Sequence, residues 1–164
     1  ELACLLGCEA EVKEWPSVVK SMRKASRARF YDKSRGVTLS GDNQVSYLSQ
    51  VWMILSGTLD KKEAVKALEY VFADDTACYI GSPYAYHYLI EAMIQCGMEE
   101  RAREMLITYW GDMVSKGADT FWEVCDPNDD FKSPYKFHPM NSYCHAWSCT
   151  PVYFIHKYKN LFQR

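Results

Sequence analysis

Apolar side chains recur along this chain every three to four residues, in segments separated by Gly, Pro, Asp and Asn. Three segments, 9–29, 60–73 and 98–116, have one apolar and one charged face. Three others, 43–56, 83–96 and 148–162, are apolar on almost every side. An amphipathic helix is half exposed, whereas a helix that is apolar all round is buried. The pattern therefore predicts an all-α protein in which the two kinds of helix alternate.

Local signals mark the ends of these helices. Val37 to Leu39 is expected to form a short extended piece before the second helix. Short polar side chains cap helix N-termini, proline is tolerated in the first turn, and glycine follows the last turn. The expected N-caps are Asp42 or Asn43, then Thr58 or Asp60, then Ser82 before Pro83, and the expected stops are Gly57 and Gly97.

Two architectures are compatible with a helix pair that recurs roughly every forty to fifty residues. One is an α-solenoid of stacked hairpins, and the other is a toroid with buried inner and half-exposed outer helices. A solenoid predicts a sequence signature repeated in each pair, and none is found. The starts of the inner helices are polar or aromatic and would gather on one rim, which favours a toroid with a central cleft. These residues are Asp42, Asn43 and Gln44, then Tyr84, Tyr86 and His87, then His145 and Trp147.

Composition indicates one globular domain. Of its 164 residues 48% are hydrophobic and 24% charged. The net charge of −2 provides no basic field, so we expect no nucleic-acid partner. No apolar run approaches the ~20 residues of a membrane span, so we expect no membrane partner.

The seven cysteines are odd in number and have no regular spacing, which favours a reducing compartment over a disulfide framework. The chain opens at Glu1 without a methionine or a positively charged signal-peptide region. We therefore expect a piece of a longer protein.

Candidate chemistry is concentrated in two motifs, 117–123 (GADTFWE) and 141–147 (NSYCHAW), which flank an irregular loop. Aromatic faces such as Trp122 and Trp147 stack on a sugar ring, while Glu123 and His145 can bond its hydroxyls. The alternative is that both tryptophans are core residues at helix ends and that Glu123 is a solvated surface carboxylate.

Other sites are weaker candidates. The loop segment 126–130 (DPNDD) begins like a calcium loop, but Phe131 and Phe137 stand where that loop needs glycine and glutamate. A Cys–His nucleophilic pair built on Cys125 or Cys144 has no feature that marks an activated thiol. A zinc site would need Cys125, His138, Cys144, His145 and Cys149 in spacings that match no common zinc motif, so we expect no metal and no cofactor.

The motifs resemble those of the α-L-rhamnosidase family of glycoside hydrolases. GADTFWE (117–123) is similar to the family's G-A-T-T-x-W-E motif, and NSYCHAWS (141–148) is similar to its N-S-L-x-H segment. GSPY (81–84) with LIEA (89–92) resembles its G-T-P-Y…L-x-E-A-L helix. The order and spacing agree along the whole chain, which implies residues 1–164 of a partial (α/α)6 toroid, about six of its twelve helices, with the N-terminal half missing.

This resemblance implies an inverting hydrolase that uses two carboxylic acids. Glu123 matches the general base, and His145 matches a histidine that bonds sugar hydroxyls. The general acid belongs to the first half of the barrel, so the isolated chain is expected to be inactive. Asp119 replaces a family threonine and Cys144 a common asparagine, which leaves the sugar open. The expected substrate-binding residues are Trp122, His145, Trp147, Asp119, Tyr84, Tyr86 and His87.

The expected partners are a carbohydrate substrate and the rest of the barrel. A half toroid leaves apolar helix faces open, so we also expect the isolated piece to self-associate. The alternative function is a non-catalytic helical-hairpin module that binds a protein or a carbohydrate.

Overall fold

The computed structural model describes residues 2–162, apart from the side chain of His138, and in that range it is mostly helical. The all-α prediction is confirmed. In chain order the elements are α1 (Leu2–Leu6), η1 (Glu9–Val12), α2 (Trp15–Phe30), β1 (Tyr31–Asp32), β2 (Val37–Thr38), α3 (Tyr47–Leu55), α4 (Lys61–Ala73), α5 (Pro83–Gln95), α6 (Glu99–Ser115), η2 (His138–Met140), η3 (Ala146–Ser148), α7 (Thr150–Lys157) and α8 (Lys159–Phe162).

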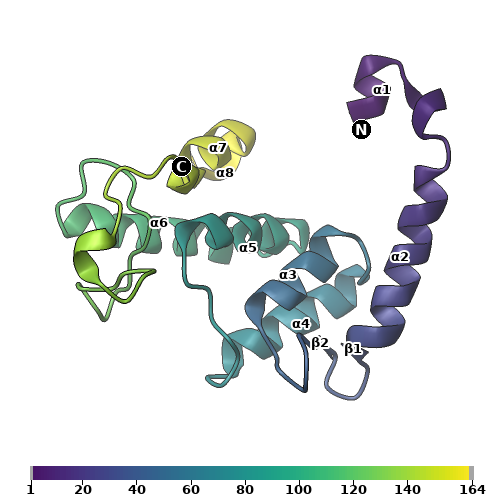
Figure 1. Cartoon of the computed structure of the whole chain (residues 1–164), viewed down its shortest axis with the longest axis horizontal. Coiled ribbons are helices and arrows are strands. Elements are labelled where there is room, and N and C mark those ends of the chain that lie inside the picture. The colour runs from purple at the N-terminus through teal and green to yellow at the C-terminus, as the bar shows by residue number, and fades with distance from the viewer. Residues whose placement is uncertain (1, 163–164) are drawn as a thin grey trace.

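The core lies around α3 and α5, which pack against each other (Figure 1). The two amphipathic helices lie on either side of this pair: α4 packs against α3, and α6 packs against α5. This arrangement confirms the predicted alternation of inner and outer helices for these four elements. The side chains at its centre are fully buried and almost all aliphatic; the largest include Val51, Leu68, Leu89, Ile90 and Met93.

Most helix ends lie where local chemistry predicts them. Asp60 caps α4: its carboxylate accepts the Glu63 N–H at 2.9 Å, and Glu63 Oε2 accepts the Asp60 N–H at 3.1 Å. Pro83 opens α5, and Gly97 follows it with a φ of 82°.

The cap of α3 differs from the prediction. Ser46 is the N-cap, and its Oγ accepts the Ser49 N–H at 3.1 Å. Asp42 and Asn43 lie upstream in a bend, because the chain remains extended as far as Val45, which bridges to Leu39. The helix therefore begins several residues later than expected.

A small hairpin holds the base of α3. Strand β1 pairs with β2 antiparallel, with Tyr31 opposite Thr38, which confirms the short extended piece. The Gln50 side chain on α3 is fully buried and bonds Thr38 twice, with Oε1 accepting its N–H at 2.7 Å and Nε2 donating to its carbonyl at 2.8 Å.

Residues 2–30, called here the N-terminal arm, stand apart from the other helices (Figure 1). We expected one half-buried helix over 9–29, and this was wrong: the segment divides into η1 and α2, and α2 has no buried residue. Trp15, Val18 and Met22 are 67%, 50% and 63% exposed, because no other described element covers this face. The arm is held at the end of α2, where Arg27 Nη1 donates to Glu63 Oε2 at 2.8 Å and to the Thr58 carbonyl at 3.2 Å.

The single buried helix predicted over 148–162 is not observed as such. It is divided into α7 and α8, because Tyr158 leaves the helical conformation between them (φ −119°, ψ 50°). Only one side of α7 is buried: Phe154 is inaccessible, while Val152 and Ile155 are 50% and 41% exposed. None of the helices built from the described residues is long and apolar enough to cross a membrane.

Candidate functional site

The long loop after α6 is held against that helix by hydrogen bonds at both of its ends. Tyr109 donates its hydroxyl to the Cys125 carbonyl at 3.1 Å, and the Trp110 indole N–H donates to the Ser148 carbonyl at 2.9 Å. Lys116 Nζ donates to the Asp126 carbonyl at 3.0 Å. An irregular loop thus acquires a defined course because it lies on a rigid helix.

The two motifs pair with each other across this loop. The Glu123 N–H donates to the Ser142 carbonyl at 2.8 Å, and the His145 N–H donates to the Phe121 carbonyl at 2.7 Å. The Thr120 hydroxyl donates to the Tyr143 carbonyl. Segments that are about twenty residues apart in sequence are therefore neighbours in space.

Glu123 is the buried carboxylate of the site, with 6% of its surface exposed. Its Oε2 accepts the Ser142 N–H at 3.1 Å, and its Oε1 accepts the Tyr135 hydroxyl at 3.4 Å. A donor on each oxygen holds the carboxylate in one orientation. The alternative of a solvated surface glutamate does not fit this burial. Tyr135 and Ser142 were not predicted as partners of Glu123, because only the folded loop brings them to its carboxylate.

A row of five aromatic rings, called here the aromatic row, extends from the second motif across α5 to α3. The rings of His145 and Trp147 lie 4.4 Å apart, those of Trp147 and Tyr84 5.1 Å apart, those of Tyr84 and Tyr88 5.2 Å apart, and those of Tyr88 and Trp52 4.6 Å apart. Trp147 and Tyr84 are 50% and 42% exposed. The fold therefore brings His145, Trp147 and Tyr84 together, as expected for residues of one rim.

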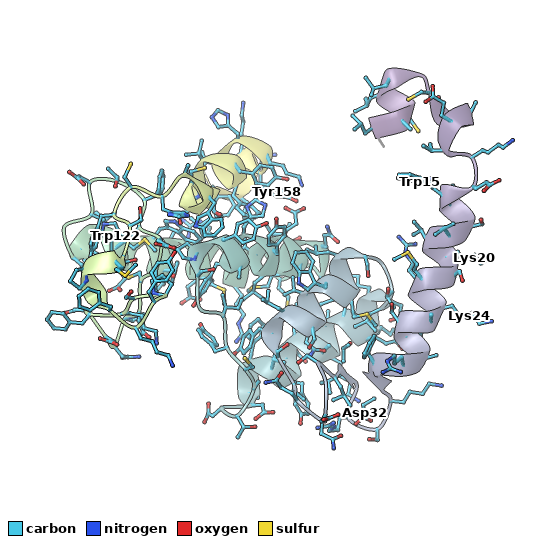
Figure 2. All side chains as sticks on the ribbon, viewed as in Figure 1. Trp15, Lys20, Lys24, Asp32, Trp122 and Tyr158 are labelled. Carbon is cyan, nitrogen blue, oxygen red and sulfur yellow. The ribbon has the colours of Figure 1, made fainter. Side chains whose placement is uncertain are left out.

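Trp122 and Asp119 do not join this group. Trp122 packs edge-on against Tyr143, with the ring centres 5.2 Å apart, and both line a cavity of about 350 Å³ whose lining does not include Glu123. Figure 2 labels Trp122 within the loop region. Asp119 lines another cavity, of about 370 Å³, beside Trp110 and Pro151. Our expectation of one pocket shared by these residues and Glu123 assumed that neighbours in sequence face the same space. In the folded loop Trp122 and Asp119 line different cavities, and Glu123 lines neither of these two.

Tyr86 is buried among the helices, whereas His87 is only partly buried. The Tyr86 ring stacks on Tyr109 with a centre distance of 3.9 Å, its hydroxyl lies 2.7 Å from that of Tyr79, and burial raises its pKa. His87 Nδ1 lies 3.4 Å from the Thr150 hydroxyl, and burial lowers the pKa of its imidazole. The His87 ring lies edge-on to Tyr88 at 5.2 Å, so His87 contacts the aromatic row, whereas Tyr86 packs on Tyr109 instead.

The cysteine and metal alternatives receive no structural support. Burial, followed by a hydrogen bond to Asp112, raises the pKa of the Cys125 thiol to about 12, which disfavours a thiolate nucleophile. Within residues 2–162 no three His, Cys, Asp or Glu side chains are grouped as metal ligands. The His138 side chain of the zinc alternative lies outside the described part of the structure.

Known proteins resemble this chain in both sequence and fold. Residues 1–158 match the family model of the bacterial α-L-rhamnosidase six-hairpin glycosidase domain. The structure is similar to a rhamnosidase from Klebsiella oxytoca with rhamnose bound, with a TM-score of 0.86 and 36% identity over 93% of this chain and 30% of that one. It is also similar in fold to a GH78 family rhamnosidase of Bacillus sp. GL1, with a TM-score of 0.79 and 24% identity over 96% of this chain and 17% of that one.

No curated protein matches the chain significantly. The two solved rhamnosidases are several times longer than the part that this chain spans. The match over nearly its whole length shows that the chain belongs to the family of bacterial α-L-rhamnosidase six-hairpin glycosidase domains.

Proposed function

We propose that this chain supplies the general-base side of an inverting glycosidase site that acts on rhamnose or a similar terminal sugar. The observation that carries the proposal is Glu123, a carboxylate that is 6% exposed and oriented by the Ser142 N–H at 3.1 Å. In an inverting reaction such a carboxylate takes a proton from the water that attacks the anomeric carbon. The solved structure of the Klebsiella oxytoca relative contains rhamnose, which favours that sugar.

The neighbouring residues have separate roles in this proposal. The His145 N–H bond to Phe121 fixes the backbone beside Glu123, and its imidazole would bond sugar hydroxyls. Trp147 and Tyr84 would provide the aromatic wall against which an apolar sugar face packs. The Tyr135 hydroxyl, 3.4 Å from Glu123 Oε1, would orient the base.

We also propose that residues 1–164 are part of an (α/α)6 toroid whose N-terminal half, with the general acid, lies outside this chain. The chain spans 30% and 17% of the two similar rhamnosidases, and the apolar face of α2 is exposed. With one of the two carboxylic acids absent, the isolated chain would not hydrolyse glycosides.

The test is Glu123→Gln in the intact parent protein, assayed with an aryl rhamnoside. Loss of a general base should lower kcat by roughly 10²–10⁴-fold, with little change in Tm because the amide has nearly the same shape. Glu69→Gln, which changes an exposed carboxylate on α4, is the matched control and should leave kcat unchanged. An unchanged kcat in the Glu123 variant would contradict the role of base. A lowered Tm with no selective loss of turnover would favour the non-catalytic helical module.

A further inference from the structure

The cavity behind the first motif has no role in the proposed reaction. It has a volume of about 350 Å³ and lies between the end of α6 and the loop. Binding pockets for small molecules occupy roughly 300–1,000 Å³, so this cavity is large enough for one small molecule or one residue of a larger ligand. Because Glu123 is not among its lining residues, a ligand here would lie outside the proposed catalytic site.

One wall of the cavity is aromatic. Trp122 and Tyr143 meet edge to face, with an angle of 89° between their rings. An indole that is only partly buried in such a wall presents an apolar surface to the cavity. Flat apolar faces of this kind pack against the C–H side of a sugar ring.

Asn141 has a buried polar atom whose missing hydrogen bond a ligand could supply. It lines the cavity and is 8% exposed, and its Nδ2 donates to the Val124 carbonyl at 3.4 Å. Its Oδ1 is buried and has no hydrogen-bond donor among the described residues. An unpaired buried amide oxygen is destabilising, and a hydroxyl group in the cavity would satisfy it.

The charges around the cavity favour a neutral ligand. Lys116 is occupied by Asp130 at 2.8 Å and Asp112 at 3.3 Å, and Lys132 lies 3.5 Å from Asp126. An anion would meet the carboxylates of Asp126, Asp129 and Asp130, and a cation would meet the two ammonium groups. A neutral polyhydroxyl ligand encounters neither repulsion, and its hydroxyls can donate to the acceptors of the wall.

From these observations we propose that this cavity is a second binding site for a neutral sugar unit, separate from the site around Glu123. Trp122 packs on the sugar ring, and Asn141 accepts a hydroxyl proton. The first motif thus contributes Trp122 to this cavity while Glu123 lies outside it, so one loop could hold a glycan at two points.

The experiment is a titration of the chain with L-rhamnose, D-glucose and D-galactose, observed through the indole N–H resonance of Trp122 in an NMR spectrum. Trp122→Phe assigns that resonance, and Trp147→Phe assigns the resonance of Trp147. A saturable shift of the Trp122 signal with at least one sugar is expected. Because the Trp122 variants lack this resonance, binding in all variants is followed through the backbone amide resonance of Asn141. By that signal, Trp122→Ala should weaken binding about tenfold, Trp122→Phe should retain most of it, and Trp147→Ala should change it less than twofold.

Choline and inorganic phosphate form the other arms of the titration. A shift of Trp122 with either of these and with no sugar would overturn the proposal. So would sugar binding that Trp122→Ala leaves unchanged while its Tm stays near that of the original chain. If Trp122→Ala does not fold, the absence of any saturable Trp122 shift in the unmutated chain still decides against the site.

The same titration on Glu123→Gln separates this proposal from the proposed function. Retained sugar binding at Trp122 is expected there even if the parent protein shows no rhamnoside hydrolysis. Turnover in the parent without a Trp122 response would support the catalytic proposal and refute the second site.

Discussion

At the scale of single residues, the informative side chains are buried polar groups whose partners are distant backbone atoms. Glu123 accepts a hydrogen bond from the Ser142 N–H. Gln50 accepts one from the Thr38 N–H and donates one to the Thr38 carbonyl. Both side chains are largely or fully buried, at 6% and 0% exposure. In each case one side chain fixes the relation between two segments that local propensity would leave independent.

Gln50→Leu should lower the free energy of unfolding by about 1–3 kcal/mol. The leucine side chain cannot accept the Thr38 N–H, so a buried donor would lose its partner. Urea unfolding followed by circular dichroism measures the change. Gln44→Leu, at an exposed position shortly before the same helix, is the control and should stay within about 0.5 kcal/mol. Equal losses in both variants would contradict this role for Gln50.

At the scale of elements, two ion-pair networks join helices that otherwise make limited contact. Glu91 on α5 accepts from Lys157 Nζ on α7 at 2.8 Å and from the Tyr158 hydroxyl at 2.8 Å. Arg27 on α2 holds Glu63 on α4. The first network positions the helix that follows the site loop, and the second holds the N-terminal arm.

Glu91→Gln should reduce the pH dependence of stability in acid. Burial would raise the pKa of Glu91, but hydrogen bonds from Lys157 and Tyr158 outweigh it, so the pKa is below its ordinary value of 4.5. Because the unfolded state then binds more protons, this contribution is present above pH 4.5 and is lost as the pH falls through the folded-state pKa. Since Lys157 is partly exposed, we expect a loss of about 1 kcal/mol or less at pH 7.

Urea midpoints measured from pH 7 to pH 3 test this expectation. The difference between the original chain and Glu91→Gln should shrink below pH 4.5. Only this difference is informative, because hydrogen bonds also lower the pKa of Asp32 and Asp74. Glu104→Gln, at an exposed position on α6, is the matched control. A difference that does not vary with pH would refute the assignment.

Arg27→Met should loosen the N-terminal arm selectively. Its guanidinium donates to Glu63 and to the Thr58 carbonyl, and α2 has no buried residue to replace these bonds. Amide hydrogen exchange in α2 should accelerate about fivefold, for a contribution of roughly 1 kcal/mol. Exchange in the core of α4 should be unchanged. Arg29→Met, an exposed change on the same helix, serves as control, and equal acceleration by both would contradict the prediction.

At the scale of the whole molecule, the main feature is apolar surface on the N-terminal arm. Leu2, Leu5 and Trp15 are 69%, 78% and 67% exposed, and a hollow of about 960 Å³ lies between α1, η1 and α2. Exposed apolar side chains gathered on one surface mark a region that packs against another element or molecule. The exposed surface of the arm fits the proposal that other helices of a toroid cover this face in the parent protein.

The isolated chain should therefore self-associate in a concentration-dependent way. Sedimentation velocity measures this, and the double variant Trp15→Ser with Met22→Ser should increase the monomer fraction, because it removes two exposed apolar side chains. Lys20→Ser on the same helix is the control and should not. A stable monomer at every concentration would count against the half-toroid proposal.

The sequence by itself determined the helices and most of their ends. Periodicity, the Asp60 capping box, Pro83 and Gly97 act within a few residues, so they can be evaluated without the fold. The same local reasoning failed for α3, where pairing of Leu39 with Val45 delayed the first turn until Ser46.

Only the tertiary structure decided how the candidate site is divided. Glu123, His145, Trp147 and Tyr84 were all named from the sequence. The ring contacts that join His145 and Trp147 to Tyr84 on α5, and the hydrogen bond from Tyr135 to Glu123, depend on contacts between distant segments. That Trp122 lines a cavity from which its neighbour Glu123 is absent likewise depends on the course of an irregular loop. Helix formation depends on residues close together in the chain, so it can be predicted from the sequence. The direction in which a loop side chain points depends on the distant residues that pack against it.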